Sequence, residues 1–133
     1  MPLKLFALLG CALLLAGCEV LFVANTLVGC AMRPEMEILP RELPVARAGE
    51  PYRVRIEVVD TSSPLTGIHV DPRQPLPAGL ALEHAERAAH GVIGGTPLTP
   101  GVYSLRIYAG SYGTQCVGKE AERSYRLEVL AAD

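Results

Sequence analysis

The stretch YRVRIEVV, residues 52–59, decides the fold. Its apolar side chains alternate with charged ones, at Tyr52, Val54, Ile56 and Val58. A period of two predicts a β-strand with one face buried and the other in water. The stretches 102–109 and 124–130 follow the same rule, with apolar side chains at Tyr103, Leu105 and Ile107 and at Tyr125, Leu127 and Val129. The sequence therefore predicts at least three strands that share one core.

Shorter stretches predict further strands around these three. They are Glu37–Leu39, Ala46 with its neighbours, Gly67–Val70, Leu80–Glu83 and Val92–Ile93. Pro and Gly punctuate the chain between them, and short strands separated by such turns predict a β-sandwich with antiparallel sheets. The segment 85–89, Ala-Glu-Arg-Ala-Ala, is too short for an independent helix. It is predicted to be a turn with at most one helical turn.

Three motifs in the second half of the chain resemble, in their order, a family of bacterial immunoglobulin-like domains that is itself similar to the cadherin-like domains. They are LPAGLAL at 76–82, GVIGGTP at 91–97 and GVYSL at 101–105. The resemblance extends over about residues 38–130 and implies an all-β, immunoglobulin-like antiparallel β-sandwich. The turn 83–90 departs from the family pattern, which has an acidic residue and Gly there. The resemblance is specific for fold and leaves the function open.

The N-terminus carries the excess of hydrophobic residues in a chain that is 50% hydrophobic but only 5% aromatic. A short basic start, residues 1–4, precedes the apolar run 5–15, which is typical of a secretion signal. Leu-Ala-Gly-Cys at 15–18 makes the segment resemble a bacterial lipoprotein signal. The resemblance implies cleavage after residue 17, a diacylglycerol thioether on Cys18, and a lipidated tether over 18–37 before the domain at 38–133.

Other interpretations of this segment stay open. The apolar character continues to Met32, so residues 5–32 could form one uncleaved helix long enough to span a bilayer. Glu19 opposes this, since a carboxylate near the centre of a span costs about 2.5–3.5 kcal/mol. Leu-Val-Gly-Cys at 27–30 also fits a lipobox, and a plain signal peptide is a further alternative.

Four cysteines are present, at 11, 18, 30 and 116. Cleavage would remove Cys11 and lipidation would use Cys18, which leaves Cys30 and Cys116 as a pair in an oxidising compartment. The immunoglobulin-like resemblance places the loop 110–122 beside the N-terminal end of the domain. We therefore predict a disulfide between Cys30 and Cys116, the alternative being that Cys116 is an unpaired buried or loop thiol.

The long last loop is the best candidate for recognition. Its candidate residues are Tyr108, Ser111, Tyr112, Thr114 and Gln115. Tyrosine rings and small polar side chains of this kind are typical of binding loops. An ordinary hairpin loop held by a disulfide is the alternative.

Signs of metal binding or catalysis are weak. His69 and Asp71 with Asp60, and His84, Glu86 and His90, are the clusters in question. Neither has the ligand spacing of a metal site. Nucleophile-elbow and phosphate-loop motifs are missing. We therefore predict no metal, no cofactor and no enzymatic activity.

The net charge of −2 is not that of a nucleic-acid-binding protein. The sequence predicts a small envelope lipoprotein that faces the periplasm or the exterior. Its partners would be membrane lipid, through Cys18, and an unknown envelope protein or glycan. The alternatives are a single-span accessory subunit of a membrane complex with an external immunoglobulin-like domain and, less favoured, an envelope enzyme.

Overall fold

The computed structural model describes residues 1–14, 17 and 19–133. The predicted lipidation site, Cys18, lies outside the described residues. The chain divides into two compact units, Met1–Arg33 and Pro34–Asp133. The predicted boundaries after residues 17 and 37 therefore stay predictions.

The first unit is the helix α1, Pro2–Ala31. Its proline lies in the first turn, where the missing N–H costs no hydrogen bond. The helix ends at Ala31, and the N–H of the C-cap residue Met32 donates to the carbonyl of Val28 at 3.0 Å. A helix of 30 residues is about 45 Å long. It is long and apolar enough to cross a membrane, and a signal sequence has the same properties.

The segment predicted as a tether is helical for most of its length, because α1 includes residues 19–31. Leucine, alanine and valine dominate this stretch, and no proline interrupts it before Pro34. The helical periodicity therefore continues through Glu19. The region between α1 and the first strand is short and contains Pro34.

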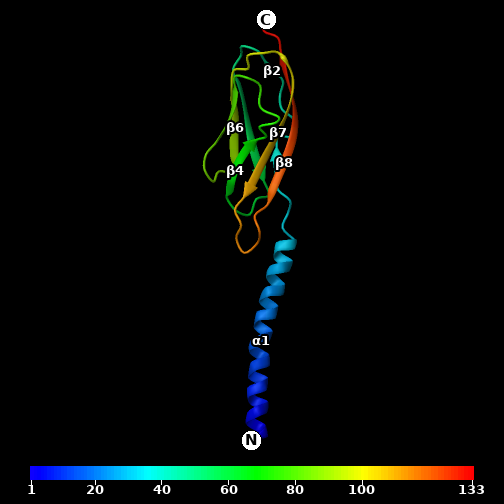
Figure 1. Cartoon of the computed structure of the whole chain (residues 1–133), viewed down its shortest axis with the longest axis vertical. Coiled ribbons are helices and arrows are strands. Elements are labelled where there is room, and N and C mark those ends of the chain that lie inside the picture. Colours follow the sequence, from blue (N-terminus) through cyan, green and yellow to red (C-terminus); the bar gives the residue numbers. More distant parts are fainter. The chain divides into compact units, whose positions relative to one another are not determined.

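The second unit is a sandwich of two four-stranded sheets (Figure 1). One sheet has the order β1 (Glu37–Leu39), β3 (Tyr52–Val59), β6 (His90–Gly95) and β5 (Leu80–His84). The other has the order β2 (Ala46–Arg47), β8 (Glu120–Leu130), β7 (Gly101–Ser111) and β4 (Leu65–Val70). The predicted fold class is therefore confirmed.

One pair of strands corrects the expectation of purely antiparallel sheets. β2 pairs with β8 in parallel, with Ala46 opposite Val129 and Arg47 opposite Leu130. The chain passes from one sheet to the other between Leu39 and Ala46 without reversing its direction. β2 therefore runs the same way as β8, whereas the other pairs are antiparallel.

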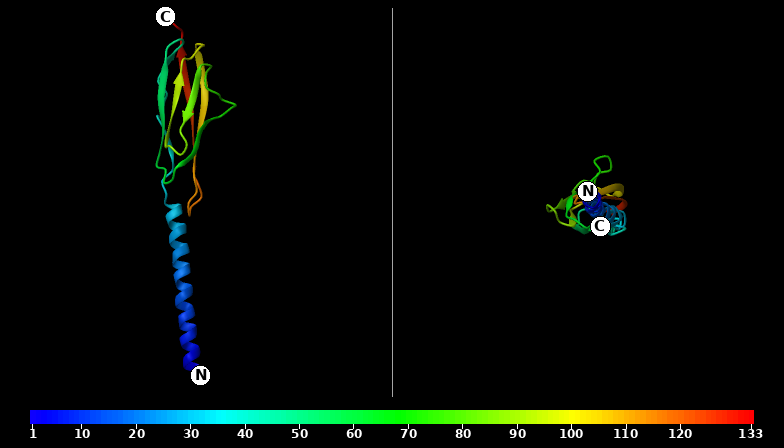
Figure 2. Two further views of the ribbon diagram at one scale, coloured as in Figure 1. Left: turned by 90° about the vertical axis from the view of Figure 1, so that its left-hand side faces the viewer. Right: turned by 90° about the horizontal axis from the view of Figure 1, so that it is seen from below.

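β7 and β8 form the longest ladder of the domain and run side by side in both views (Figures 1 and 2). The pairing extends from Gly101 opposite Val129 to Gly110 opposite Glu120. The loop between these strands is Tyr112–Lys119, shorter than the predicted 110–122, because the ladder continues past the last alternating residues.

The core lies between the two sheets and is built from aliphatic side chains with two tyrosines. The most deeply buried are Ile38, Ile56, Leu65, Ile93, Leu105, Ile107 and Leu127. The predicted inward faces of β3, β7 and β8 are confirmed by their burial. Each fully buried aliphatic side chain contributes about 1.5–3 kcal/mol.

Two of the family-like motifs meet where β5 begins and β6 ends. Gly79 has φ +93° and Gly95 has φ +128°. Thr96 N–H donates to the carbonyl of Gly79 at 3.1 Å, and Leu98 N–H donates to that of Ala78 at 3.0 Å. A Cβ at Gly79 would lie 1.9 Å from the Thr96 oxygen. The close backbone contact explains why glycines occupy both motifs.

The segment 85–89 is a turn, as predicted, but it contains no helical turn. Arg87, with φ 65°, instead forms a bridge with Leu65. One isolated helical hydrogen bond does not compensate for fixing the backbone of a whole turn. Pairing with a neighbouring strand is therefore preferred here.

Candidate functional site

The structure separates the five predicted recognition residues. Tyr108 and Ser111 belong to β7, and Tyr112, Thr114 and Gln115 belong to the loop. Ser111 is buried, its N–H donates to the Lys119 carbonyl at 2.8 Å, and its Oγ accepts from Lys119 N–H at 2.9 Å. Ser111 therefore closes the base of the loop and faces no solvent.

Tyr112 links the last loop to two neighbouring loops. Its N–H donates to the Pro64 carbonyl at 3.0 Å, and its carbonyl accepts from Ser63 Oγ at 2.6 Å. The guanidinium of Arg87 lies 5.1 Å from the centre of its ring. Such cation–π contacts contribute about 0.5–1 kcal/mol at exposed sites. The ring is therefore partly occupied by a contact within the domain, although 41% of the residue is exposed.

The last loop lies at the end of the domain where the chain enters it (Figure 2). Lys119 Nζ donates to the Pro34 carbonyl at 2.8 Å and forms an ion pair with Glu35 at 2.9 Å. The C-terminus lies at the other end of the domain (Figure 1). This is the arrangement of loop and N-terminal end that the immunoglobulin-like resemblance implies.

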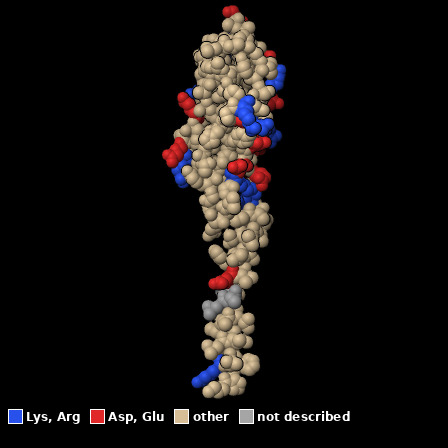
Figure 3. All heavy atoms as spheres, viewed as in Figure 1, with Lys and Arg blue, Asp and Glu red and all other residues tan. Residues whose placement is uncertain are grey.

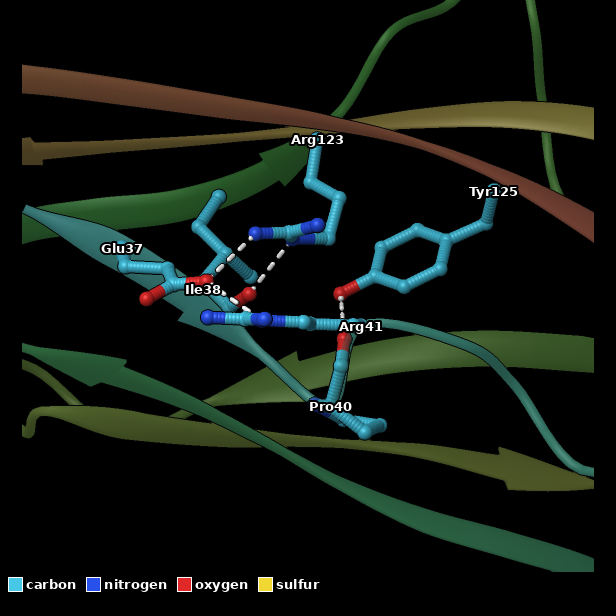
Figure 4. Close-up of polar contacts among 6 residues, drawn as sticks. All are labelled: Glu37, Ile38, Pro40, Arg41, Arg123 and Tyr125. Atoms are coloured by element: carbon cyan, nitrogen blue, oxygen red, sulfur yellow. Dashed lines mark hydrogen bonds and ion pairs between the residues drawn. The ribbon is translucent and has the colours of Figure 1, made fainter.

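A second group of contacts holds β1 against β8 (Figure 4). Arg123 donates from Nε to the Ile38 carbonyl at 2.6 Å and from Nη2 to Glu37 Oε1 at 2.9 Å. Arg41 Nε reaches the same Glu37 oxygen at 3.0 Å. Each charged group here has a partner of opposite charge, so the cluster is suited to holding strands together.

Tyr125, in the same region, has its phenol in the core. Its Oη donates to the Pro40 carbonyl at 2.7 Å (Figure 4). Burial raises the pKa of Tyr125 to about 12, which the nearby Arg123 opposes. The phenol therefore stays neutral and acts as a structural donor.

The outer face of the sheet β2-β8-β7-β4 carries a candidate site that includes Tyr108, one of the predicted recognition residues. Tyr108 on β7 lies opposite His69 on β4 and opposite Glu122 on β8. Gly110, two residues after Tyr108, lies opposite Glu120, which is two residues before Glu122. Because side chains at positions two apart share a face of a strand, these residues form one patch that crosses three strands.

Two adjoining hollows, which we call the Tyr108 recess, lie in this patch. One, of about 220 Å³, is lined by Thr66, His69, Tyr108, Ala109, Gly110 and Glu120. The other, of about 230 Å³, is lined by Tyr108, Glu120, Ala121 and Glu122. A Cβ at Gly110 would lie 2.7 Å from Thr66 Oγ1. The missing side chain at Gly110 therefore opens the recess.

Hydrogen bonds with residues beside the recess hold the phenol of Tyr108. Its Oη donates to Asp71 Oδ2 at 3.4 Å and accepts from Arg106 Nη1 at 3.4 Å. Asp71 is buried, and Arg73 donates to its two carboxylate oxygens from Nε and Nη2, both at 3.2 Å. These bonds from Arg73 hold the pKa of Asp71 below its usual value. Tyr108 is therefore placed by a charged network on a rigid sheet.

Neither predicted acidic or histidine cluster forms a metal site in the described part of the chain. The carboxylate of Asp71 is occupied by Arg73, and His69 lies on the neighbouring strand β4. His84 Nε2 lies 2.7 Å from the Ala88 carbonyl, within its own turn. Asp71 and His84 therefore take part in local structure.

The recess contains Tyr108, one of the predicted recognition residues, and also Thr66, Glu120 and Glu122, which were not predicted. The two glutamates fell inside the predicted loop, so their common face could not be recognised. Only the ladder register, which places Glu120 opposite Gly110, brings them beside Tyr108.

The chain matches no family model and no curated protein, whereas solved structures share its fold. An endo-fucoidan hydrolase of glycoside hydrolase family 107, MfFcnA4, has 18% identity and a TM-score of 0.57, covering 80% of this chain and 15% of that one. The sialic acid binding region of a Streptococcus sanguinis SK1 adhesin, bound to 3'sLn, has 14% identity and a TM-score of 0.55, covering 75% and 31%.

A PapD-like domain of human CEP192 matches over most of its own length. It has 11% identity and a TM-score of 0.50, and the match covers 74% of this chain and 87% of that one. The chain spans less than a third of the hydrolase and adhesin chains it matches. These similarities show the fold, and the second unit is an immunoglobulin-like β-sandwich.

Proposed function

We propose that the protein is an envelope-anchored binding module without catalytic activity. The Tyr108 recess carries this proposal, because three strands place its side chains and a charged network holds the central phenol. Rigid sheets present such groups with little loss of conformational entropy on binding. The adhesin region with the same fold is a sialic acid binding region, which supports a binding role for this architecture.

The anchor we propose is lipid on Cys18. It is supported by the Leu-Ala-Gly-Cys motif and by the apolar helix α1. After cleavage, Cys18 Sγ would carry a diacylglycerol thioether, and acyl chains bind a bilayer with about 0.8 kcal/mol for each buried CH₂. The sandwich would then face the periplasm or the exterior, with a protein or glycan as its partner.

A second candidate is a single-span membrane protein that presents the same domain. The uninterrupted course of α1 from Pro2 to Ala31 favours it. It requires that Glu19 be accommodated in the span, where a carboxylate costs about 2.5–3.5 kcal/mol. The two candidates share the binding module and differ in processing.

Substitution of Cys18 separates these two candidates. Cells that express the wild type or Cys18→Ser are grown with radiolabelled palmitate, and the intact mass of each protein is measured. The lipoprotein should take up label and lose residues 1–17, whereas Cys18→Ser should remain an unlabelled precursor. Cys11→Ser is the matched control and should behave as wild type. An unlabelled wild type of full-length mass would instead establish the single-span form.

Site-directed photo-crosslinking tests the binding role. A benzophenone amino acid replaces Ser104, on the same outer face of β7 as Tyr108, or Ala81, on the strand β5 of the other sheet. Both are exposed and are uncharged. Irradiation of whole cells should give a crosslinked product of defined mass from position 104 and none from position 81. Absence of a product from position 104 would contradict a binding function for this face.

A further inference from the structure

We infer that the Tyr108 recess receives a basic side chain, arginine or lysine, from a protein partner. This inference rests on the proposed function, because it names the chemistry of the partner for the same site. It follows from the charge of the recess, its shape and the way its polar groups are already used.

The charge of the recess is negative. Glu120 and Glu122 are exposed on the same face of β8, and within the described residues neither carboxylate forms an ion pair. Asp71 and Arg73 neutralise one another. The remaining charged neighbour is Arg106, whose Nη1 donates to the Tyr108 phenol at 3.4 Å. Two carboxylates thus share one guanidinium, which the charge of Glu122 attracts and whose Nη1 alone is bonded to Tyr108. His69 completes the titratable groups of the recess.

Exposed acidic side chains elsewhere on the described domain are of two kinds: some are paired, and others, such as Glu83 and Glu86, form no ion pair there. Several exposed acidic side chains on the domain have a basic neighbour within ion-pair distance, as Glu50 has in Arg47 and Glu128 has in Arg126. In Figure 3, acidic and basic side chains likewise lie close together over the face of the domain that is shown. The two glutamates of the recess form no ion pair within the described residues and lie together on the face that carries Tyr108, so charge complementarity selects a cation as their partner.

The shape of the recess suits a flat or compact cation. The hollow above Gly110 has walls from Tyr108 and Glu120, and Tyr108 and Glu120 also line the second hollow. A guanidinium can contact an aromatic ring and donate two parallel hydrogen bonds to a carboxylate. An inserted arginine would thus contact the Tyr108 ring and both glutamates together. A lysine would interact with the same groups as a point charge.

A titration of the full-length protein in detergent micelles tests this inference. The probe is the peptide acetyl-Gly-Ser-Arg-Ser-Gly-amide, and the control is the same peptide with citrulline, which keeps the shape and removes the charge. We expect the arginine peptide to shift the backbone amide NMR signals of Gly110, Glu120 and Glu122. The citrulline peptide should bind about tenfold more weakly, because charge-assisted hydrogen bonds are the stronger ones.

Variants locate the effect and control for it. The double variant Glu120→Gln and Glu122→Gln should lower the affinity for the arginine peptide about tenfold, and raising the salt concentration should weaken wild-type binding. Glu83→Gln, on β5 of the other sheet, should bind as wild type. Equal binding of the citrulline peptide, or unchanged binding by the double variant, would overturn the inference.

A neutral sugar distinguishes the other class of ligand. If N-acetylglucosamine shifts these amides and the arginine peptide does not, the recess binds a hydroxyl-rich ligand and the inference is wrong. The proposed function would survive in that case, since the photo-crosslinking from position 104 measures binding without regard to the partner's charge. Loss of crosslinking would contradict the binding function itself.

Discussion

The guanidinium of Arg123 on β8 donates to the carbonyl of Ile38 on β1 at 2.6 Å. These residues belong to different sheets, so the hydrogen bond joins the two layers near the start of the domain. Arg123 also donates to Glu37 at 2.9 Å, and Lys119 further along the same hairpin donates to Pro34. The first residues of the domain are therefore fastened to the β7–β8 hairpin, whose outer face carries the Tyr108 recess.

Arg123→Met should lower the stability of the domain. The substitution keeps the length of the side chain and removes both donors, leaving the Ile38 carbonyl and Glu37 without them. Hydrogen bonds that involve a charged group contribute about 1.5–3 kcal/mol each, so we expect a loss of about 2 kcal/mol. Urea unfolding of the full-length protein in micelles, followed by tyrosine fluorescence, measures it.

Arg126→Met is the control for this prediction. Arg126 lies on the same strand, its side chain is 68% exposed, and its ion pair with Glu128 is 3.9 Å long. Exposed pairs of this kind contribute about 0–1 kcal/mol. Equal losses of stability in the two variants would show that the fastening at Arg123 has no special role.

Two buried tyrosines should make the domain lose stability at alkaline pH. Burial raises the pKa of Tyr52 and of Tyr125 to about 12. In an unfolded chain the pKa of tyrosine is about 10. As the pH rises above the unfolded value, the unfolded chain releases phenolic protons that the folded domain retains. The free energy of unfolding should therefore be fully maintained below about pH 10 and fall from there toward pH 12.

The steepness with which the free energy of unfolding falls with pH shows whether the two tyrosines cause the fall. In the double variant Tyr52→Phe and Tyr125→Phe, urea midpoints measured from pH 8 to pH 11 should decline less steeply than in wild type. The variant should also be less stable at neutral pH, because hydrogen bonds to Pro44 and Pro40 are lost. Tyr103→Phe, which removes an exposed hydrogen bond to Thr99, serves as the control. An unchanged slope in the double variant would refute the assignment.

Gly95 and Gly94 should respond differently to the same substitution. A Cβ at Gly95 would lie 2.1 Å from the Gly79 oxygen, and φ there is +128°. At Gly94 the nearest atom is the Tyr52 oxygen, at 3.9 Å. Gly95→Ala should therefore cost at least about 1–3 kcal/mol from backbone strain alone, and Gly94→Ala should be tolerated. Thermal unfolding of the two variants checks this, and similar midpoints would contradict the close contact.

The strands were predictable because their side chains alternate. Alternation of apolar and polar residues follows directly from which side chains face the core. Leu105, Ile107 and Leu127, for example, are all fully buried. The recess was not predictable, because it depends on the register that places Glu120 opposite Gly110. Pairing between distant residues sets that register, and the polar residues beyond the alternating stretches resemble a loop. The parallel pairing of β2 with β8 is likewise a property of how the chain passes between sheets.

The last prediction concerns Cys30 and Cys116, for which we propose a disulfide. Cys116 shortly precedes Lys119 in the sequence, Cys30 shortly precedes Pro34, and Lys119 Nζ donates to the Pro34 carbonyl at 2.8 Å. Alkylation without reductant should leave both thiols unlabelled in the intact mass, and reduction should expose two sites. Closing so long a loop stabilises the fold by about 4 kcal/mol in the chain-entropy model.

Three serine variants test whether these cysteines act as a pair. Cys30→Ser, Cys116→Ser and the double variant should lose the same amount of stability, because either single substitution already opens the loop. Additive losses would show that the two residues act separately, and labelling of both thiols in the unreduced wild type would exclude the bond. If the bond forms, the end of α1 is joined covalently to the β7–β8 loop, while Lys119 and Arg123 hold the first residues of the domain to the same hairpin. Force or motion at the anchor would then reach the strands that carry the Tyr108 recess.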